Sequence, residues 1–171
     1  MISQKLQSAL NDQINAELWS AYMYLSMSLH AETQALKGMA QWLYVQWQEE
    51  QDHARIFQNF MNDNQSRVVL QPVSSVPVEW ESPLQMFHEA LQHEEKVTQM
   101  IEQLVQMAYR ERNLPTLSRL QWFVDEQVEE EASLHDVVAR LEMVSDNPAG
   151  IQALDDKLAT RTYEPAAPLC K

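Results

Sequence analysis

The chain has 171 residues, which is enough for one domain with a sizeable hydrophobic core. Its apolar share of 45% argues against disorder, and its formal net charge of −13 argues against nucleic acid or an anionic membrane surface as a partner. Only two glycines occur, and apolar residues recur at helical rather than alternating spacing, so an all-α fold is predicted. No stretch approaches the roughly 20 apolar residues of a membrane-spanning helix.

The two ends of the chain suggest a cellular location. The sequence begins MISQKLQSALNDQ, which is polar and helical in pattern, so no secretory signal is expected. A single cysteine, Cys170, excludes an intrachain disulfide and fits a reducing compartment. We therefore expect a cytoplasmic protein, with Cys170 at a frayed end.

Five helices are predicted, in chain order at about residues 3–32, 36–62, 82–110, 114–144 and 147–161. The third has Ser82 as a candidate cap, with Pro83 at the first helical position and Gln85 completing a possible capping box. The fifth follows Asn147 as cap and ends before a proline-containing tail at 162–171.

Connection lengths predict the topology. Short turns join the first helix to the second and the third to the fourth, so each pair should be antiparallel. The segment 63–81 lacks helical periodicity and can span roughly 60 Å, whereas a helix of about 28 residues is about 42 Å long. It can therefore start the third helix at the opposite end of the bundle. The predicted fold is a four-helix bundle with one long crossover and a short fifth helix.

Each of the four long helices places a glutamate on its apolar face. Each glutamate lies seven residues, about two turns, from an apolar residue on either side. Each also lies near the midpoint of its helix, and the midpoints of equally long helices meet at one depth. These residues are Glu17, Glu50, Glu94 and Glu130, with His53 one turn after Glu50.

The clustering of these acids predicts a metal centre. One inward glutamate could pair with a lysine or arginine, but Arg55, Lys96 and Arg140 all fall off the inward faces. Unpaired buried carboxylates cost several kcal/mol each and repel one another. They could share protons, but a divalent or trivalent metal ion would neutralise them better. Carboxylates with one imidazole favour iron or manganese, so we predict a dinuclear centre.

The two metal ions should differ in their ligands. Symmetric centres carry Glu-x-x-His on two helices, but only Glu50 and His53 form such a pair here, and Val97 follows Glu94 at that spacing. The first ion would take Glu17, Glu50 and His53. The second would take Glu50 as a bridge, Glu94 and Glu130, with Gln127 close by. Lacking a nitrogen ligand, the second ion should bind more weakly, which suits metal that enters and leaves.

These motifs resemble those of one family. NAELWSAYMYLSM, QEEQDH and LQWFVDEQVEEE occur in the order found in bacterial non-haem ferritins, and the likeness covers essentially the whole chain. Gln127 matches the residue that separates ferritins from bacterioferritins. The resemblance implies one ferritin-like domain over 1–171 and a homo-oligomeric, hollow 24-subunit cage. Such a cage oxidises Fe²⁺ with O₂ or H₂O₂ and stores hydrated ferric oxide.

The resemblance also implies roles for individual residues. The ferroxidase centre would comprise Glu17, Glu50, His53, Glu94, Gln127 and Glu130. Tyr24 and Trp122 match aromatic residues near that centre and are possible electron donors, although alone they would read as ordinary core aromatics. A third iron site nearer the cavity would use Glu49, Glu126, Glu129 and Glu130. From the residues alone, VDEQVEEE also reads as a solvated acidic face.

Two departures from related families limit what can be carried over. Bacterioferritins bind haem through a methionine where this chain has Gln51 and Asp52, so no haem is expected. Animal ferritins line an iron channel with acids where this chain has Arg119 and Trp122, so iron is expected to reach the centre through the subunit wall. The remaining histidines have no partner at ligand spacing and are expected at the surface: His30, His88, His93 and His135.

Two other functions stay open at this stage. The first is a di-iron oxidase, peroxidase or oxygenase that keeps its metal ions and acts on an organic substrate. The second is an acidic helical bundle that binds a protein partner, although this leaves four level glutamates unexplained.

Overall fold

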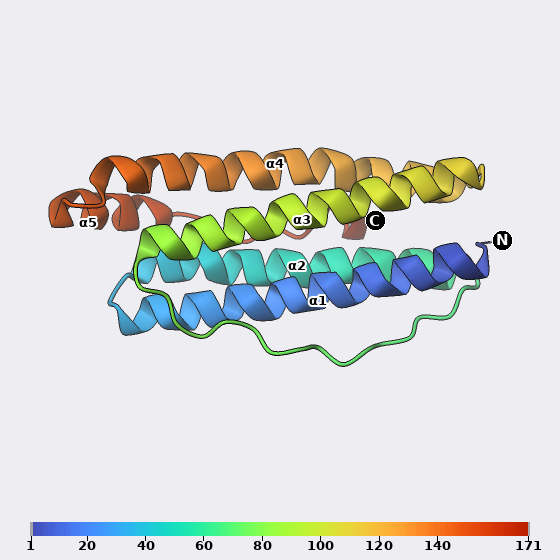
Figure 1. Ribbon diagram of the computed structural model, residues 1–171, viewed down its shortest axis with the longest axis horizontal. Coiled ribbons are helices and arrows are strands. Elements are labelled where there is room, and N and C mark those ends of the chain that lie inside the picture. The colour runs from blue at the N-terminus through green and yellow to red at the C-terminus, as the bar shows by residue number, and fades with distance from the viewer. Residues whose placement is uncertain (1, 171) are drawn as a thin grey trace.

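The computed structural model describes residues 2–170. Four long helices lie side by side (Figure 1): α1 (Gln4–Thr33), α2 (Lys37–Asp63), α3 (Pro83–Arg110) and α4 (Leu114–Val144). A short helix, α5 (Pro148–Leu158), and one 3-10 turn (Ala167–Leu169) follow. No strand occurs in this part of the chain, and none of its helices is both long enough and apolar enough to span a membrane. The predicted all-α fold is confirmed.

Most helices begin with a side-chain cap from the preceding residue. Ser3, Ser82, Asn113 and Asn147 each accept a hydrogen bond from a backbone N–H in the first turn of α1, α3, α4 and α5. The expected capping box is only half formed, because the Gln85 side chain accepts from the N–H of Glu81 rather than of Ser82.

Helix α2 is capped from a distant part of the chain. Leu36 offers no side-chain cap, but the Asp155 carboxylate of α5 accepts from the N–H groups of Gly38 (3.0 Å) and Met39 (2.7 Å). The approach is close, since a Cβ added at Gly38 would lie 1.7 Å from the Asp155 carbonyl oxygen. Glycine at this position therefore lets α5 dock on the start of α2.

The crossover, residues 64–82, lies along α1 (Figure 1). The Val69 N–H donates to Asn11 Oδ1 at 2.7 Å, and further along both segments Ser26 Oγ donates to Pro77 O at 2.6 Å. The crossover therefore runs parallel to α1 and brings the start of α3 to the far end of the bundle. This is the topology that the connection lengths predicted.

A layer of buried polar residues divides the hydrophobic core into two clusters. Along α1, one cluster ends at Ile14 and the other begins at Met23; along α3 the boundary falls between Leu91 and Val97. Six predicted site residues lie in this interval, and each is at most 5% exposed: Glu17, Glu50, His53, Glu94, Gln127 and Glu130. Polar groups thus occupy the middle of the core, although burying them costs free energy.

The C-terminal strap, defined here as residues 159–170, runs back from α5 along α2 (Figure 1). Tyr163 Oη and the Ala166 N–H both donate to Asp52 Oδ2, at 2.8 and 3.0 Å. Leu169 packs against the apolar cluster that contains Ile14. Cys170, at the end of the strap, is exposed, and its predicted fraying stays a prediction. Helix α5 stops at Leu158, three residues earlier than predicted, because the chain turns there into the strap.

Candidate metal centre

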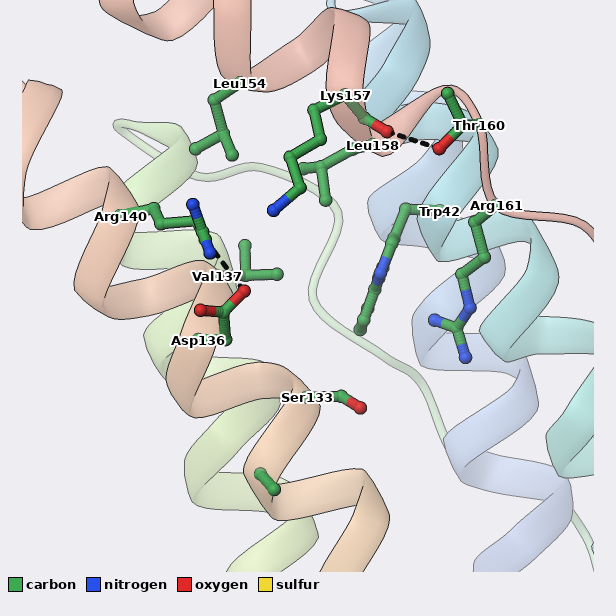
Figure 2. Close-up of a pocket in the computed structure, with 11 residues that line it drawn as sticks. Trp42, Ser133, Asp136, Val137, Arg140, Leu154, Lys157, Leu158, Thr160 and Arg161 are labelled. Atoms are coloured by element: carbon green, nitrogen blue, oxygen red, sulfur yellow. Dashed lines mark hydrogen bonds and ion pairs between the residues drawn. The ribbon is translucent and has the colours of Figure 1, made fainter.

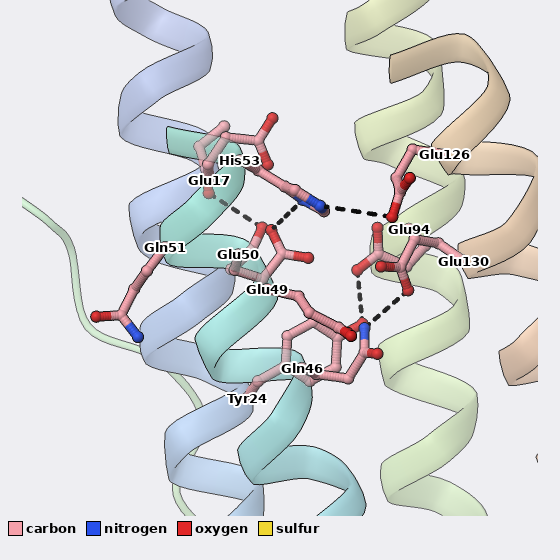
Figure 3. Close-up of polar contacts among 12 residues, drawn as sticks. Glu17, Tyr24, Gln46, Glu49, Glu50, Gln51, His53, Glu94, Glu126 and Glu130 are labelled. Atoms are coloured by element: carbon pink, nitrogen blue, oxygen red, sulfur yellow. Dashed lines mark hydrogen bonds and ion pairs between the residues drawn. The ribbon is translucent and has the colours of Figure 1, made fainter. Parts of the chain in front are cut away.

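Glu17, Glu50 and His53 converge in the polar layer. Their ligand atoms all lie within 4.8 Å of one another, and His53 Nδ1 is 3.5 Å from Glu50 Oε2. The i, i+3 spacing puts Glu50 and His53 on one face of α2, while α1 supplies Glu17 (Figure 3). This is the set predicted for the first metal ion.

A second compact group joins α2 to α4. It consists of His53, Glu126 and Glu130, again with ligand atoms within 4.8 Å of one another. His53 Nε2 lies 3.9 Å from Glu126 Oε1, so the two ring nitrogens approach carboxylates of two different helices. The set predicted for the second ion, with Glu94 and Glu50 beside Glu130, does not form a compact group in the described chain and stays a prediction.

Glu94 is held by neighbouring side chains. Tyr24 Oη donates to Glu94 Oε1 at 2.5 Å, and Gln127 Nε2 donates to Glu94 Oε2 at 3.3 Å. Burial, reinforced by the Glu130 charge, raises the pKa of Glu94 to about 8 despite these hydrogen bonds. Burial and the Glu94 charge also raise the pKa of Tyr24 well above its usual value. Without a metal ion, the environment of Glu94 therefore favours its neutral, protonated form.

The pKa values of the other central groups are also shifted by burial and by one another's charges. Burial raises the pKa of Glu17 and Glu50, although His53 opposes the shift. Burial lowers the pKa of His53, but the Glu50 charge and the contact with Glu126 outweigh burial and raise it well above its usual value. Glu17 Oε2 is buried without a hydrogen-bond partner. An unpartnered carboxylate oxygen beside an imidazole is a fitting ligand for a hard cation such as iron.

Two buried amides, not predicted from the sequence, orient the carboxylates. Gln13 Nε2 donates to Glu17 Oε1, and Gln46 Nε2 donates to Glu130 Oε2, both at 2.8 Å. Both glutamines are at most 1% exposed. The sequence feature that could have revealed them is a glutamine one turn before Glu17 and another one turn before Glu50, each on an otherwise apolar helix face.

Of the four residues expected to form a third site, Glu130 lies in the layer and the other three lie at its rim. Glu126 is half-buried and joins the second compact group, whereas Glu129 is exposed and belongs to neither. Glu49 also belongs to neither; its Oε2 accepts from Arg161 Nη2 at 2.6 Å. Burial raises the pKa of Glu49 to about 7, even though Arg161 opposes the shift.

Four further residues considered in the sequence differ in their burial and contacts. Trp122 is half-buried, with its ring edge-on to His53 at a centroid distance of 5.6 Å. Arg119 is also half-buried, and Gln51 is exposed. Asp52, which lies with Gln51 between Glu50 and His53, is buried and accepts hydrogen bonds from the strap.

The prediction that the other histidines lie at the surface is wrong for His93. Its Nε2 lies 2.6 Å from Ser20 Oγ and its ring packs 5.0 Å from that of Trp19. Burial, with the Lys96 charge, lowers the pKa of His93 to about 4. The α1–α3 contact thus supplies a partner that residue spacing within one helix could not reveal. His30 is half-buried against Trp80, whereas His88 is partly exposed and His135 exposed.

Fold and site together define a class of protein: a four-helix bundle whose core is interrupted by a carboxylate-rich layer suited to metal ions. Residues 7–144 match the family model described as a ferritin-like domain. The chain belongs to the ferritin family.

Individual relatives agree with this assignment. A bacterial non-heme ferritin from Bacteroides fragilis (strain YCH46) is 38% identical over 161 residues, which cover 94% of this chain and all of that protein. One from Staphylococcus aureus (strain MRSA252) is 32% identical over 164 residues, covering 96% and 99%. The solved open pore ferritin from the archaeon Archaeoglobus fulgidus is 44% identical, with a TM-score of 0.94 over 95% of this chain and all of that one. The resemblance to bacterial non-haem ferritins drawn from the motifs is confirmed.

Proposed function

We propose that this protein stores iron. It oxidises Fe²⁺ in the polar layer with O₂ or H₂O₂ as the oxidant, and it holds the ferric product as oxyhydroxide inside a cytoplasmic cage of 24 copies. The observation that carries the proposal is the set of buried carboxylates around His53, between two apolar clusters, with Glu17 Oε2 lacking a partner. The names of the related bacterial proteins support the same function.

The side chains of the layer perform the first step by exchanging protons for Fe²⁺. Glu17, Glu50 and His53 bind one ion, and Glu50 bridges to a second ion on the side of Glu94 and Glu130. The raised pKa of Glu94 means that metal binding there releases a proton. Gln13 and Gln46 hold the carboxylates of Glu17 and Glu130 in place during this exchange.

Oxidation then moves one electron from each of two Fe²⁺ ions. With O₂ and two protons the products are two Fe³⁺ and H₂O₂; with H₂O₂ and two protons they are two Fe³⁺ and two H₂O. Hard carboxylate ligands favour Fe³⁺ over Fe²⁺ and so drive the step. Tyr24 lies close enough to Glu94 to serve as an additional electron donor. The ferric product moves inward, toward the cavity of the cage, past Glu49, Glu126 and Glu129.

The deciding experiment is iron retention. Metal-free protein is loaded aerobically with excess Fe²⁺ and separated by size, and iron is counted per chain. Storage predicts scores of iron atoms per chain in a particle of several hundred kilodaltons. Two or three iron atoms per chain in a small oligomer would instead identify a di-iron oxidase or peroxidase that retains its metal.

A further inference from the structure

Arg161 of the strap is fixed on two sides. Its Nη2 donates to Glu49 Oε2 at 2.6 Å, and the two side chains are only 24% and 21% exposed. Its guanidinium carbon also lies 4.3 Å from the centre of the Trp42 ring, an arrangement that attracts a cation. Figure 2 shows the Arg161 guanidinium beside this ring, at the wall of a pocket of about 440 Å³ between α2, α4 and α5.

The strap holds Arg161 in this position. Gln41 Nε2 donates to the Arg161 carbonyl oxygen at 3.3 Å, and two residues later Tyr163 is anchored on Asp52. The guanidinium is therefore presented by an ordered segment, unlike a surface side chain that must give up its freedom to form an ion pair.

Glu49 lies next to the metal centre and also contacts Arg161. It is the neighbour of Glu50 in sequence, and the charges of Glu130, Glu126 and His53 all act on it. Across residues 2–170, the Arg161 pair is the one ion pair between a lysine or arginine and any acid of the layer or its rim. In a chain with a net charge of −13, this guanidinium supplies the positive charge that pairs with Glu49.

We propose that Arg161 is a positioning residue of the metal path: it holds the Glu49 carboxylate until a metal ion arrives, and that ion must displace it. This inference rests on the proposed function, because the ion is iron leaving the dinuclear centre. The outer site is defined here as the expected third site of Glu49, Glu126, Glu129 and Glu130, and the inner sites are those of the dinuclear centre. Competition from the guanidinium makes the outer site bind metal more weakly than its carboxylates alone would. Iron therefore binds there briefly and passes on to the mineral.

The test measures binding of Zn²⁺, which undergoes no oxidation, to the full-length assembled protein by calorimetry. In Arg161→Gln the outer site should bind Zn²⁺ about tenfold more tightly, with the inner sites unchanged. Arg161→Lys should restore most of the competition, and Glu49→Gln should abolish the outer site. A residue that only stabilised the fold would weaken binding when removed, so the direction of change separates the two roles.

Two matched variants exclude simpler explanations. Lys157→Gln removes a positive charge from the same pocket without touching Glu49 and should change the affinity less than threefold. Tyr163→Phe loosens the strap but keeps the charge of Arg161, and should have a smaller effect than Arg161→Gln. Unchanged or weaker outer-site binding in Arg161→Gln, or an outer site that survives Glu49→Gln, would overturn the proposal. If the unmodified protein bound no Zn²⁺ at the inner sites, the proposed function itself would be refuted.

Discussion

Gln13 and Gln46 illustrate how single residues prepare the centre. Gln13 donates one amide hydrogen bond to Glu17, and Gln46 donates one to Glu130. A neutral donor orients the carboxylate without cancelling its charge, whereas a lysine in the same place would neutralise it and compete with metal. The amides therefore preserve the affinity of the layer for cations.

Glu50 provides the sharpest test at the residue scale. It belongs to the compact group with Glu17 and His53 and is the proposed bridge to the second ion. Glu50→Ala should slow the initial rate of Fe²⁺ oxidation by roughly 100-fold or more, because loss of an outer-shell partner alone typically costs 10–100-fold. Glu95→Ala, an exposed acid beside Glu94, is the matched control and should leave the rate unchanged. Stopped-flow absorbance measures both; a normal rate in Glu50→Ala would refute the site.

The central acids could be predicted because helical periodicity determines both their direction and their depth. The contact between Arg161 and Glu49 could not be predicted from periodicity. Arg161 lies in an irregular segment whose path depends on tertiary contacts. The same limitation explains the error at His93, whose partner Ser20 lies on another helix. The buried glutamines escaped notice because glutamine is an ordinary residue in helices.

At the scale of elements, the start of α2 depends on α5. Asp155 accepts the N–H groups of Gly38 and Met39, which would otherwise be unpaired at a buried helix end. The four long helices begin and end within one residue of the predicted positions, because apolar period and caps act locally. The docking of α5 on α2 joins residues more than a hundred positions apart in the sequence, and no local pattern indicates it.

Removing this distant cap has a measurable consequence. Asp155→Ala should lower the free energy of unfolding by about 1 kcal/mol, as for other helix caps, and speed amide exchange at Gly38 and Met39. Asp156→Ala is the control, since Asp156 is exposed and only accepts from Gln152. Thermal unfolding and hydrogen exchange measure the two effects. Equal behaviour of the two variants would show that Asp155 does not stabilise α2.

At the scale of the whole molecule, the polar layer makes stability depend on pH. In the folded chain the pKa values of Glu94 and Glu49 are raised to about 8 and 7, so between their unfolded and folded pKa values the unfolded chain binds fewer protons. Stability therefore falls as pH rises through this range. The raised pKa of His53 acts in the same direction. The lowered pKa of His93 acts oppositely, but only below about pH 6.5.

The metal-free protein should consequently lose roughly 2–3 kcal/mol, or about 5–10 °C in Tm, between pH 6.5 and 8.5. Saturating Zn²⁺ should remove this loss, because metal replaces the protons and binds more tightly as they leave. Glu94→Gln should flatten the metal-free profile. Differential scanning calorimetry is the measurement, and a Tm that rises across this range would contradict the assignment of buried protonated acids.

The strap also decides what happens to anything attached to this chain. The N-terminal end lies at one end of the bundle, where Ser3 Oγ donates to Glu111, whereas the strap ends beside the bundle (Figure 1). A tag or cargo protein fused after the strap would pull on the segment that carries Arg161 and Tyr163. One fused before α1 would load only a turn between α3 and α4. Fusions at the two ends are therefore not equivalent, and the N-terminal end is the safer place for a purification tag.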